Sequence, residues 1–294
     1  MLLDSLDIYI ISLKDSPRRV VCQTVVESPP LNSYSLAFNF HIFDAIDKYS
    51  HYFSKDLGYT GFMENSYSPK WLKSGDWYQG LYGRELFPEE LGCYASHYML
   101  WLKCIVLNRP IVILEDDFDL QSNFYESLLD CLKSHFDFVR LYGNFWKANP
   151  SVSAIANLDG SACTPTNPKI ETLLRGHFLL ATYEVDSTSA YYLTPKAAKA
   201  FVSFSQYFTE PVDQFLNRAC LHAIPNLTYI PLSVRFSKHH ANSTVFTQDN
   251  LSLREQSYKR VWIRKFTRLF YLIRSKIRRQ RLYHHFLRQY KYVQ

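Results

Sequence analysis

The chain has 294 residues, of which 47% are hydrophobic and 16% aromatic, so it can bury a sizeable core and is not expected to be disordered. No run of about 18 apolar residues occurs, so the sequence predicts no transmembrane helix. Residues 1–13 lack the basic region of a secretory signal. The net charge of +6 is uneven: residues 254–294 carry 13 Lys/Arg and one acid, whereas residues 1–253 are net −6. This division predicts one domain over 1–253 and a basic C-terminal region that meets an anionic surface.

The six cysteines do not form close pairs in the sequence, and no histidine cluster lies beside them. This spacing argues against a zinc site or a disulfide framework, and reduced thiols that serve packing are expected. The cysteines are Cys22, Cys93, Cys104, Cys131, Cys163 and Cys220.

The chain opens with a predicted buried strand over Asp7–Leu13, which is followed by a basic turn. Ser16 before Pro17 is a candidate N-cap for the helix that comes next. A second short strand is predicted over Phe38–Ile46. Residues 47–88 show no clear period and are interpreted as a long insertion. Its aromatic side chains could form a sugar-stacking platform or could be ordinary packing: Trp71, Trp77, Tyr78 and Tyr82.

A helix is predicted from Pro88 to Asn108, with apolar residues at helical spacing along it. The aliphatic run that follows, residues 111–114, is typical of a fully buried strand. It leads directly into Glu115, Asp116 and Asp117. In open α/β sheets ligands bind at the carboxyl ends of strands, and adjacent carboxylates are costly unless a cation or donors compensate them. A Mg²⁺ or Mn²⁺ site is one interpretation, and a solvated acidic turn is the other.

The remaining elements alternate between strands and helices, which predicts an α/β fold with a mainly parallel sheet. They comprise a helix over 123–132, a strand over 136–141, a loop region over 143–170, a strand over 189–193, a helix over 196–204 capped by Thr194, a helix over 210–222 and a strand over 227–231.

Residues 258–294 are predicted to form a basic amphipathic helix. Its apolar face is made by Trp262, Phe266, Leu269, Phe270, Ile273 and Ile277. Aromatic residues on the apolar face and arginines around it are typical of a helix lying in a membrane interface. The same face could instead pack on the domain. Nucleic acid is not the expected partner, because no nucleic-acid-binding motif accompanies the charge.

Four segments of the sequence point to one sugar-nucleotide site. A nucleotide could lie across the end of the first strand, beside Ser12 and Leu13, with Arg18 and Arg19 as possible phosphate contacts. Asp44 could hold a base or ribose. The third and fourth segments supply the other candidate ligand contacts, which are Glu90, Ser96 and His97 on the helix that starts at Pro88, and Glu115 and Asp116 after the acidic strand.

Six short motifs occur in one order along residues 7–235, and together they resemble the family 25 glycosyltransferases. They read I-I-S-L-K-x-S-P-R-R, F-D-A-I-D, E-E-L-G-C-Y-A-S-H, I-V-I-L-E-D-D, S-A-Y-Y-L-T-P-K-A-A and P-V-D-x-F-L. That family includes lipooligosaccharide galactosyl- and glucosyltransferases of Gram-negative bacteria. Each motif alone is weak, whereas six in the family's order form a specific signal.

The resemblance implies a GT-A type fold: a Rossmann-like mixed, mainly parallel sheet with flanking helices. It also implies an inverting transfer of galactose or glucose from a UDP-sugar to a lipopolysaccharide or lipooligosaccharide core glycan, assisted by Mn²⁺ or Mg²⁺. The family's acidic motif falls on Glu115 and Asp117, and Asp117 is the expected direct metal ligand. Metal sites of this fold often gain a ligand from a C-terminal segment, for which His240 is the candidate; a surface histidine pair with His239 is the alternative.

An inverting displacement needs a base for the acceptor hydroxyl. The resemblance assigns this role to Asp213, with Glu210 as the substitute. The alternative for Asp213 is an acid in the first turn of a helix, where the helix dipole favours it. Asp119 is expected to be solvated.

Two other functional classes remain open from the sequence. One is a membrane-surface or nucleic-acid binding protein with a degenerate nucleotide fold, and the other is a metal-dependent phosphohydrolase that uses the acidic cluster. For the transferase, a lipid-linked acceptor predicts a cytoplasmic enzyme that is peripheral on the inner face of the bacterial inner membrane. The sequence leaves open the donor sugar, the acceptor and the oligomeric state.

Overall fold

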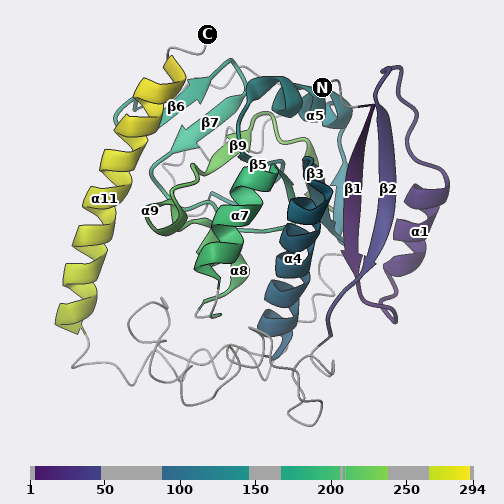
Figure 1. The fold of residues 1–294 in the computed structure, drawn as a ribbon, viewed down its shortest axis with the longest axis horizontal. Helices are drawn as coiled ribbons and strands as arrows, with labels where there is room; N and C mark the ends of the chain where they lie inside the picture. Colours follow the sequence, from purple (N-terminus) through teal and green to yellow (C-terminus); the bar gives the residue numbers. More distant parts are fainter. Residues whose placement is uncertain are drawn as a thin grey trace.

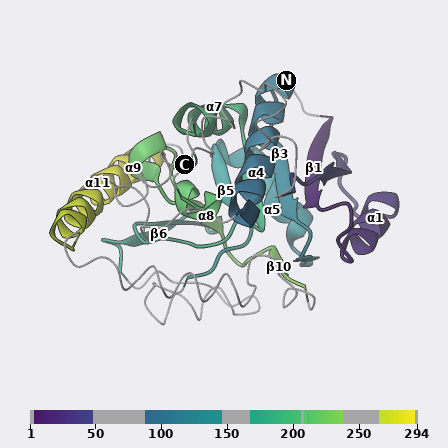
Figure 2. The same cartoon turned by 90° about the horizontal axis from the view of Figure 1, so that it is seen from below.

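The computed structural model describes residues 4–47, 88–145, 167–205, 208, 210–237 and 265–291. These residues form an eight-stranded sheet with helices on both faces (Figures 1 and 2). A separate two-stranded antiparallel ribbon pairs β4 with β10. The predicted α/β class with flanking helices is therefore confirmed.

The described elements follow the order that the sequence predicted, with four additional short strands. The strands are β1 (Ser5–Ser12), β2 (Ala37–Asp44), β3 (Ile111–Glu115), β4 (Phe118–Leu120), β5 (Phe138–Arg140), β6 (Glu171–Leu174), β7 (Phe178–Ala181), β8 (Ala190–Leu193), β9 (Leu227–Tyr229) and β10 (Val234–Phe236). The helices are α1 (Arg19–Glu27), α4 (Pro88–Leu107), α5 (Phe124–Ser134), α7 (Pro195–Phe204), α8 (Val212–Leu216), α9 (Ala219–His222) and α11 (Lys265–Lys291).

The strand order in the main sheet is β2-β1-β3-β8-β5-β9-β7-β6. The pairs β1–β2, β1–β3 and β5–β9 are parallel, whereas β8 runs antiparallel to both β3 and β5, and β7 runs antiparallel to β6 and β9. Six of the eight strands therefore run in one direction and β7 and β8 run in the other, so the sheet is mixed and mainly parallel in strand direction, as predicted.

Strand register brings three predicted site segments to one edge of the sheet. Ser12 pairs with Asp44 at the end of β1 and β2, and Ile11 pairs with Glu115 at the end of β3. Parallel strands end on the same side, which is where α/β sheets bind their ligands. The fold therefore collects residues 12, 44 and 115 from positions about a hundred residues apart.

Side chains of the central strands alternate between two cores, because successive residues of a strand point to opposite faces. Leu6, Ile8 and Ile10 of β1 face the core that contains α5, whereas Tyr9 and Ile11 face the core that contains α4, α7 and α8. Val112 and Leu114 of β3 also face the core that contains α5. Both faces of the sheet are covered, which explains why these strands read as continuous apolar runs.

Three local predictions are corrected by the structure. Helix α1 begins at Arg19 and not at Pro17; the Ser16 hydroxyl donates to Asp116, and its oxygen accepts from the N–H of Arg18 at 3.3 Å in the turn before the helix. The helix predicted over 210–222 is divided into α8 and α9. The short strands β4, β6, β7 and β10 were not predicted.

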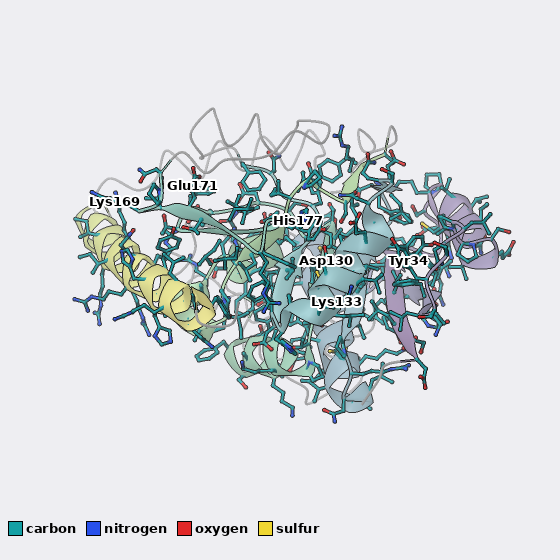
Figure 3. All side chains as sticks on the ribbon, turned by 90° about the horizontal axis from the view of Figure 1, so that it is seen from above. Tyr34, Asp130, Lys133, Lys169, Glu171 and His177 are labelled. Carbon is teal, nitrogen blue, oxygen red and sulfur yellow. The ribbon has the colours of Figure 1, made fainter. Side chains whose placement is uncertain are left out.

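Helix α11 is part of the domain over its second half. Tyr283 and Phe286 are buried in the core shared with α5, and the Tyr283 hydroxyl lies 2.6 Å from that of Thr172 on β6. Arg279 forms a 3.1 Å ion pair with Glu184, and Gln280 donates to the carbonyl of Lys169, which Figure 3 labels beside this helix. Among the described helices none is long and apolar enough to cross a membrane.

The residues of the predicted apolar face of α11 whose side chains the structure describes are half exposed, and another side of the helix packs on the domain. Ile273 and Ile277, which belong to the predicted apolar face, are 50% and 49% exposed. The buried residues 283 and 286 lie on another side of the helix, about a quarter-turn or more away. Trp262 lies outside the described residues.

Gly92 on α4 is required by a close backbone approach. A Cβ at this position would lie 2.5 Å from the carbonyl oxygen of Ile46, just after β2. We expect Gly92→Ala to lower the free energy of unfolding by about 1–3 kcal/mol, because the backbone must shift to relieve the overlap. Val106→Ala on the same helix, at an 83% exposed side chain, is the control and should stay within about 0.5 kcal/mol. Urea denaturation of both variants measures the difference; equal stabilities would contradict the packing argument.

Candidate active site

Glu115 ends β3 and is held by side chains from two other elements. Its Oε1 lies 3.2 Å from Nε2 of His97 on α4 and also accepts a hydrogen bond from the Thr188 hydroxyl just before β8. The backbone N–H of Glu115 donates to the carbonyl of Ser189 at 2.8 Å. The carboxylate is thus oriented by the sheet and by α4 together.

A hydrogen-bonded chain extends from Glu115 into the core. His97 Nδ1 lies 2.8 Å from the Tyr191 hydroxyl, and that hydroxyl accepts a hydrogen bond from Trp101 Nε1 at 2.9 Å. The Tyr191 hydroxyl can donate to Nδ1 of a neutral His97 or accept from Nδ1–H of the protonated ring, and in both states Nε2–H can donate to Glu115. His97, Trp101 and Tyr191 are fully buried, so the chain excludes water behind the carboxylate.

The pKa of Glu115 reflects two opposing effects. Burial by itself raises the pKa of this carboxyl, but the hydrogen bond and charge of His97, with the bond from Thr188, hold it below its ordinary value. Glu115 is therefore an ionised acceptor and not a proton donor at neutral pH.

Asp116 points away from Glu115 and fixes the loop after β1. Its Oδ2 accepts hydrogen bonds from Ser12 at 3.0 Å and Ser16 at 2.9 Å, and its Oδ1 forms a 2.9 Å ion pair with Arg18. Ser12 is 1% exposed. Ser12 and Asp116 therefore bind each other, and they shape the turn containing Leu13 that the sequence assigned to the nucleotide.

Arg19 and Asp44 form the outer part of this region. The Arg19 guanidinium donates to Asp44 at 2.6 Å and to the carbonyl of Ser12 at 3.2 Å, and Lys14 lies 3.4 Å from the same carboxylate. The Arg19 hydrogen bond is the main reason that the pKa of Asp44 is lowered. Asp44 is half exposed, so this pair is accessible to a ligand.

Asp117 is buried at 6% exposure, and its carbonyl accepts a hydrogen bond from the N–H of Ser237 at 2.6 Å. This bond ties the acidic turn to the segment after β10. The pKa of Tyr142 is raised to about 12 by burial and by the nearby charge of Asp117. Asp119, in contrast, is exposed on β4, as the sequence predicted.

The Cys93 thiol lies beside Glu115: its Sγ and the ligand atoms of His97 and Glu115 lie within 4.8 Å of one another. Burial, and then the charges of Glu115, Asp213, Glu90 and Asp117, raise the pKa of this thiol well above the ordinary value. The thiol is therefore protonated at neutral pH and is not a nucleophile. The segment before β8 joins the strand-end acids to α8, because Thr188 donates to Glu115 and Asp186 accepts from the side chain of Gln214, which also donates to Asp213.

Among the described residues, one group of side chains lies close enough together to hold a metal ion. It comprises Cys93, His97 and Glu115, whose potential ligand atoms all lie within 4.8 Å of one another. Glu115 is shared with the predicted metal site. Asp117 stays a predicted ligand, and His240, with Lys238 and His239, lies outside the described residues.

Asp213 begins α8 in an acidic environment. Burial and the neighbouring Asp186 raise its pKa to about 6, although the backbone N–H of Gln214, 2.8 Å from Oδ1, and the charge of Arg140 act in the opposite direction. Gln214 bridges Asp213 and Asp186 with its side-chain amide. A carboxyl with a pKa near neutrality is suited to accept a proton.

Arg140 was not identified from the sequence, although it lies beneath this acidic group. It is fully buried on β5, where Nε donates to Asn226 at 2.8 Å and one terminal nitrogen donates to the Ser187 carbonyl. Burial lowers its pKa to about 10, and the charges of Asp213 and Asp186 oppose that shift. The sequence offered one signal for Arg140, which is a basic residue at the end of a short apolar strand.

Two other predicted site residues are used within the protein. Glu210 is buried and accepts hydrogen bonds from Arg218 at 2.6, 3.0 and 3.1 Å, and burial raises its pKa against the charge of this arginine. Ser96 is fully buried; it accepts from the N–H of Ile46 and donates to the carbonyl of Gly92, both at 2.8 Å. Ser96 therefore positions the end of β2.

Some predicted contacts cannot be placed. The aromatic platform Trp71, Trp77, Tyr78 and Tyr82 lies outside the described residues. Thr188, Tyr191 and Trp101 were not identified as site residues, although Trp101 follows His97 by one helical turn and Tyr191 stands in a motif already noted. Helical spacing from His97 was the signal that could have found Trp101.

The fold and the site define the class of protein. A mixed α/β sheet collects acidic residues at the ends of its parallel strands and adds Asp213, a buried carboxyl of raised pKa in the first turn of α8, which is an arrangement suited to an enzyme that binds its ligand at the strand ends. The sequence model for glycosyltransferase family 25, described as lipopolysaccharide biosynthesis proteins, matches residues 5–216. The chain belongs to this family. Comparison with individual curated proteins gives no match.

The Tyr191 hydroxyl is hydrogen-bonded to two buried partners, so its removal should lower the free energy of unfolding. We expect Tyr191→Phe to lower the free energy of unfolding by about 1–3 kcal/mol, because Trp101 Nε1 and His97 Nδ1 are left buried without it. Tyr34→Phe removes the same atom from a 43% exposed side chain and should have almost no effect. Chemical denaturation monitored by tryptophan fluorescence compares the two; a neutral Tyr191→Phe would mean that the buried chain is not formed.

Proposed function

We propose that this family 25 glycosyltransferase transfers galactose or glucose from a UDP-sugar, with inversion, to a lipopolysaccharide or lipooligosaccharide core glycan. The observation that carries the proposal is the segment just before β8, where Thr188 binds Glu115 and Asp186 binds the side-chain amide of Gln214, which also donates to Asp213. One group of carboxylates is suited to a cation and a diphosphate. The other supplies a proton acceptor, and an inverting transfer needs both functions at one place.

Glu115 and Asp117 would hold a divalent ion, Mn²⁺ or Mg²⁺, for which oxygen ligands at a strand end are suitable. When bound, the ion supplies positive charge that stabilises the diphosphate leaving group. His97 and Thr188 orient Glu115 for this role. Arg19 and Asp44 lie at the neighbouring strand ends, and we assign them to the nucleotide.

Asp213 would take the proton from the acceptor hydroxyl as that oxygen attacks the anomeric carbon of the donor. Its pKa of about 6 leaves it ionised at neutral pH but basic enough to accept a proton. The charge of Asp186 raises the pKa of Asp213, and the charge of Arg140 lowers it. Gln214 fixes the orientation of the carboxyl.

A phosphohydrolase is less well supported than a transferase. A two-metal hydrolase uses paired acids and histidines around both ions. The metal-binding group found in the described part of the chain instead contains a protonated cysteine and a histidine that is already bonded on both nitrogens.

The acceptor of such an enzyme is anchored in a bilayer, and α11 provides a means of reaching it. Ile273 and Ile277 are half exposed on a helix that carries nine Lys/Arg and no Asp/Glu. Such a surface suits an anionic membrane interface. We therefore assign the protein a peripheral position on the inner face of the inner membrane.

Removing Asp117 tests the metal and donor together. We expect Asp117→Ala to reduce Mn²⁺-dependent UDP release from UDP-galactose or UDP-glucose by about 100-fold or more, because the leaving diphosphate loses its compensating charge. Asp119→Ala, two residues away at an exposed position, should retain activity. Equal activity of both variants, or UDP release that needs no metal, would contradict the assignment. Turnover of p-nitrophenyl phosphate in place of either donor would favour the hydrolase.

The pH dependence tests the base. Since Asp213 must be ionised to accept a proton and its pKa is about 6, the rate should rise with pH through about 6 and then level off. Asp213→Asn should abolish this step and reduce the rate by about 10²–10⁴-fold. The pKa of Asp213 lies above its ordinary value, so its ionisation costs stability above pH 6. The variant should therefore be at least as stable as the parent at pH 8. A retained rate would exclude Asp213 as the base.

A further inference from the structure

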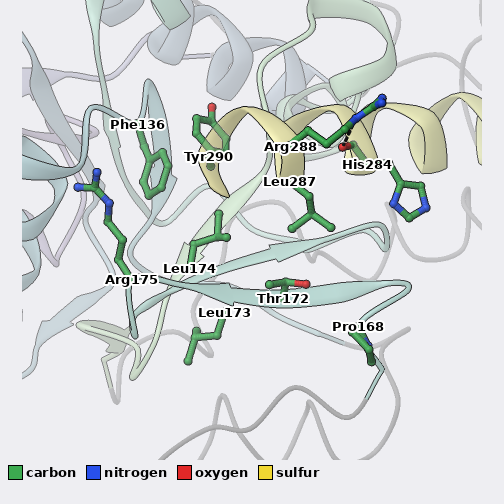
Figure 4. Close-up of a pocket in the computed structure, with 10 residues that line it drawn as sticks. All are labelled: Phe136, Pro168, Thr172, Leu173, Leu174, Arg175, His284, Leu287, Arg288 and Tyr290. Carbon is green, nitrogen blue, oxygen red and sulfur yellow. Dashed lines mark hydrogen bonds between the residues drawn. The ribbon is translucent and has the colours of Figure 1, made fainter. Parts of the chain in front are cut away.

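A pocket of about 700 Å³ lies between the second half of α11 and the strand β6, with Phe136 on its inner side (Figure 4). Its volume is within the range of small-molecule sites. The pocket lies at the end of the sheet opposite to the candidate active site. In Figure 1 the second half of α11 and the strand β6 are at the top, whereas β1 and β2, which end at Ser12 and Asp44, end at the bottom.

The pocket has an apolar interior and a basic rim. Phe136, Leu174 and Leu287 supply hydrocarbon surface, together with the ring of Tyr290. Arg175, Arg288 and His284 also line it (Figure 4). A cavity of this kind matches a molecule with a hydrocarbon chain and an anionic group next to it.

The rim is fixed by the fold. Arg175 donates to the Lys133 carbonyl at 3.2 Å, and its guanidinium lies 5.9 Å from the centre of the Phe136 ring. Arg288 donates to the carbonyl of His284 at 3.3 Å, one turn earlier on α11. These contacts hold both guanidinium groups at the pocket.

The pocket also lies on the exposed apolar face of α11. Ile273, Ile277, His284 and Leu287 follow one another at spacings that keep them within about 80° of each other around the helix. The first two are half exposed, and the last two line the pocket. A bilayer that contacts Ile273 and Ile277 would therefore also be next to the pocket mouth.

We propose that this pocket binds one anionic phospholipid of the membrane, with part of an acyl chain among Phe136, Leu174 and Leu287 and the phosphate against Arg175 and Arg288. The proposal rests on the peripheral membrane position assigned above, and it adds a specific lipid site to it. The bound lipid is distinct from the sugar acceptor because the pocket and the strand-end acids lie at opposite ends of the sheet. Its role is to fix the orientation of the enzyme on the surface.

Binding of a monomeric short-chain lipid distinguishes a specific site from general attraction to a membrane surface. The full-length protein is titrated by calorimetry with dihexanoyl phosphatidylglycerol below its micelle concentration, and separately with dihexanoyl phosphatidylcholine and inorganic phosphate. We expect the anionic lipid to bind at least about tenfold more tightly than either control, since only it has both the chain and the charge. Equal binding of phosphate would identify a phosphate site and overturn the lipid assignment, as would no binding of the anionic lipid.

Three substitutions locate the lipid. Leu287→Trp fills the pocket and Arg288→Glu reverses its rim charge, and each should weaken binding by about tenfold or more. Arg278→Glu makes the same charge change at an exposed position on another side of α11 and should leave binding of the monomer unchanged. If Arg278→Glu weakens binding as much as Arg288→Glu, the effect is general electrostatics and the pocket is excluded. Arg288→Glu, at an exposed side chain, is the decisive variant if Leu287→Trp does not fold.

Two further measurements distinguish the lipid site from the proposed catalytic site and from the proposed membrane position. UDP release should be unchanged in Arg288→Glu, because the pocket is remote from Glu115 and Asp213; loss of release with retained folding would overturn that separation. Sedimentation with phosphatidylglycerol vesicles should fall in the Ile273→Glu/Ile277→Glu variant while binding of the monomer is retained. If the parent does not sediment but binds the monomer, the peripheral position is wrong and the lipid site stands.

Discussion

The structure depends on how three consecutive carboxylates are accommodated at the end of β3. Adjacent residues leave a strand in different directions, so each acid meets a different partner. Glu115 is held by His97 and Thr188, Asp116 by the loop after β1, and the backbone of Asp117 by Ser237. Without these partners the mutual repulsion and burial of the acids would be costly. The same contacts join α4, β8, the first loop and the segment after β10 into one site.

The two halves of the proposed chemistry have opposite electrostatic environments. Glu115 has a lowered pKa because His97 and Thr188 favour its charged form, whereas burial and Asp186 raise the pKa of Asp213. Carboxyls pushed apart in this way can serve as a cation ligand and as a proton acceptor within one pocket. The backbone N–H of Gln214 and the charge of the fully buried Arg140 act against this rise and lower the pKa of Asp213.

Helix α11 combines a structural role with a surface role. Its second half completes the core through Tyr283 and Phe286, so the basic C-terminal region is not simply an appended tail. Its other face presents Ile273 and Ile277 to solvent. Because the helix is fixed to the sheet edge, any surface it contacts also fixes the direction in which the strand-end acids face.

The sequence by itself determined the fold class, the order of most elements and the strand-end acids, because buried parallel strands are apolar throughout and their polar ends stand out. It also identified Asp213 through a motif. Only the tertiary structure decided what each residue contacts. Ser96 and Glu210 look like site residues in a motif, but the fold uses them for Ile46 and Arg218. Arg140, Thr188 and Tyr191 join the site only through strand pairing, and the face of α11 that packs was decided by the sheet edge it meets. Pairing and packing join residues far apart in the chain, and local spacing carries no record of those contacts.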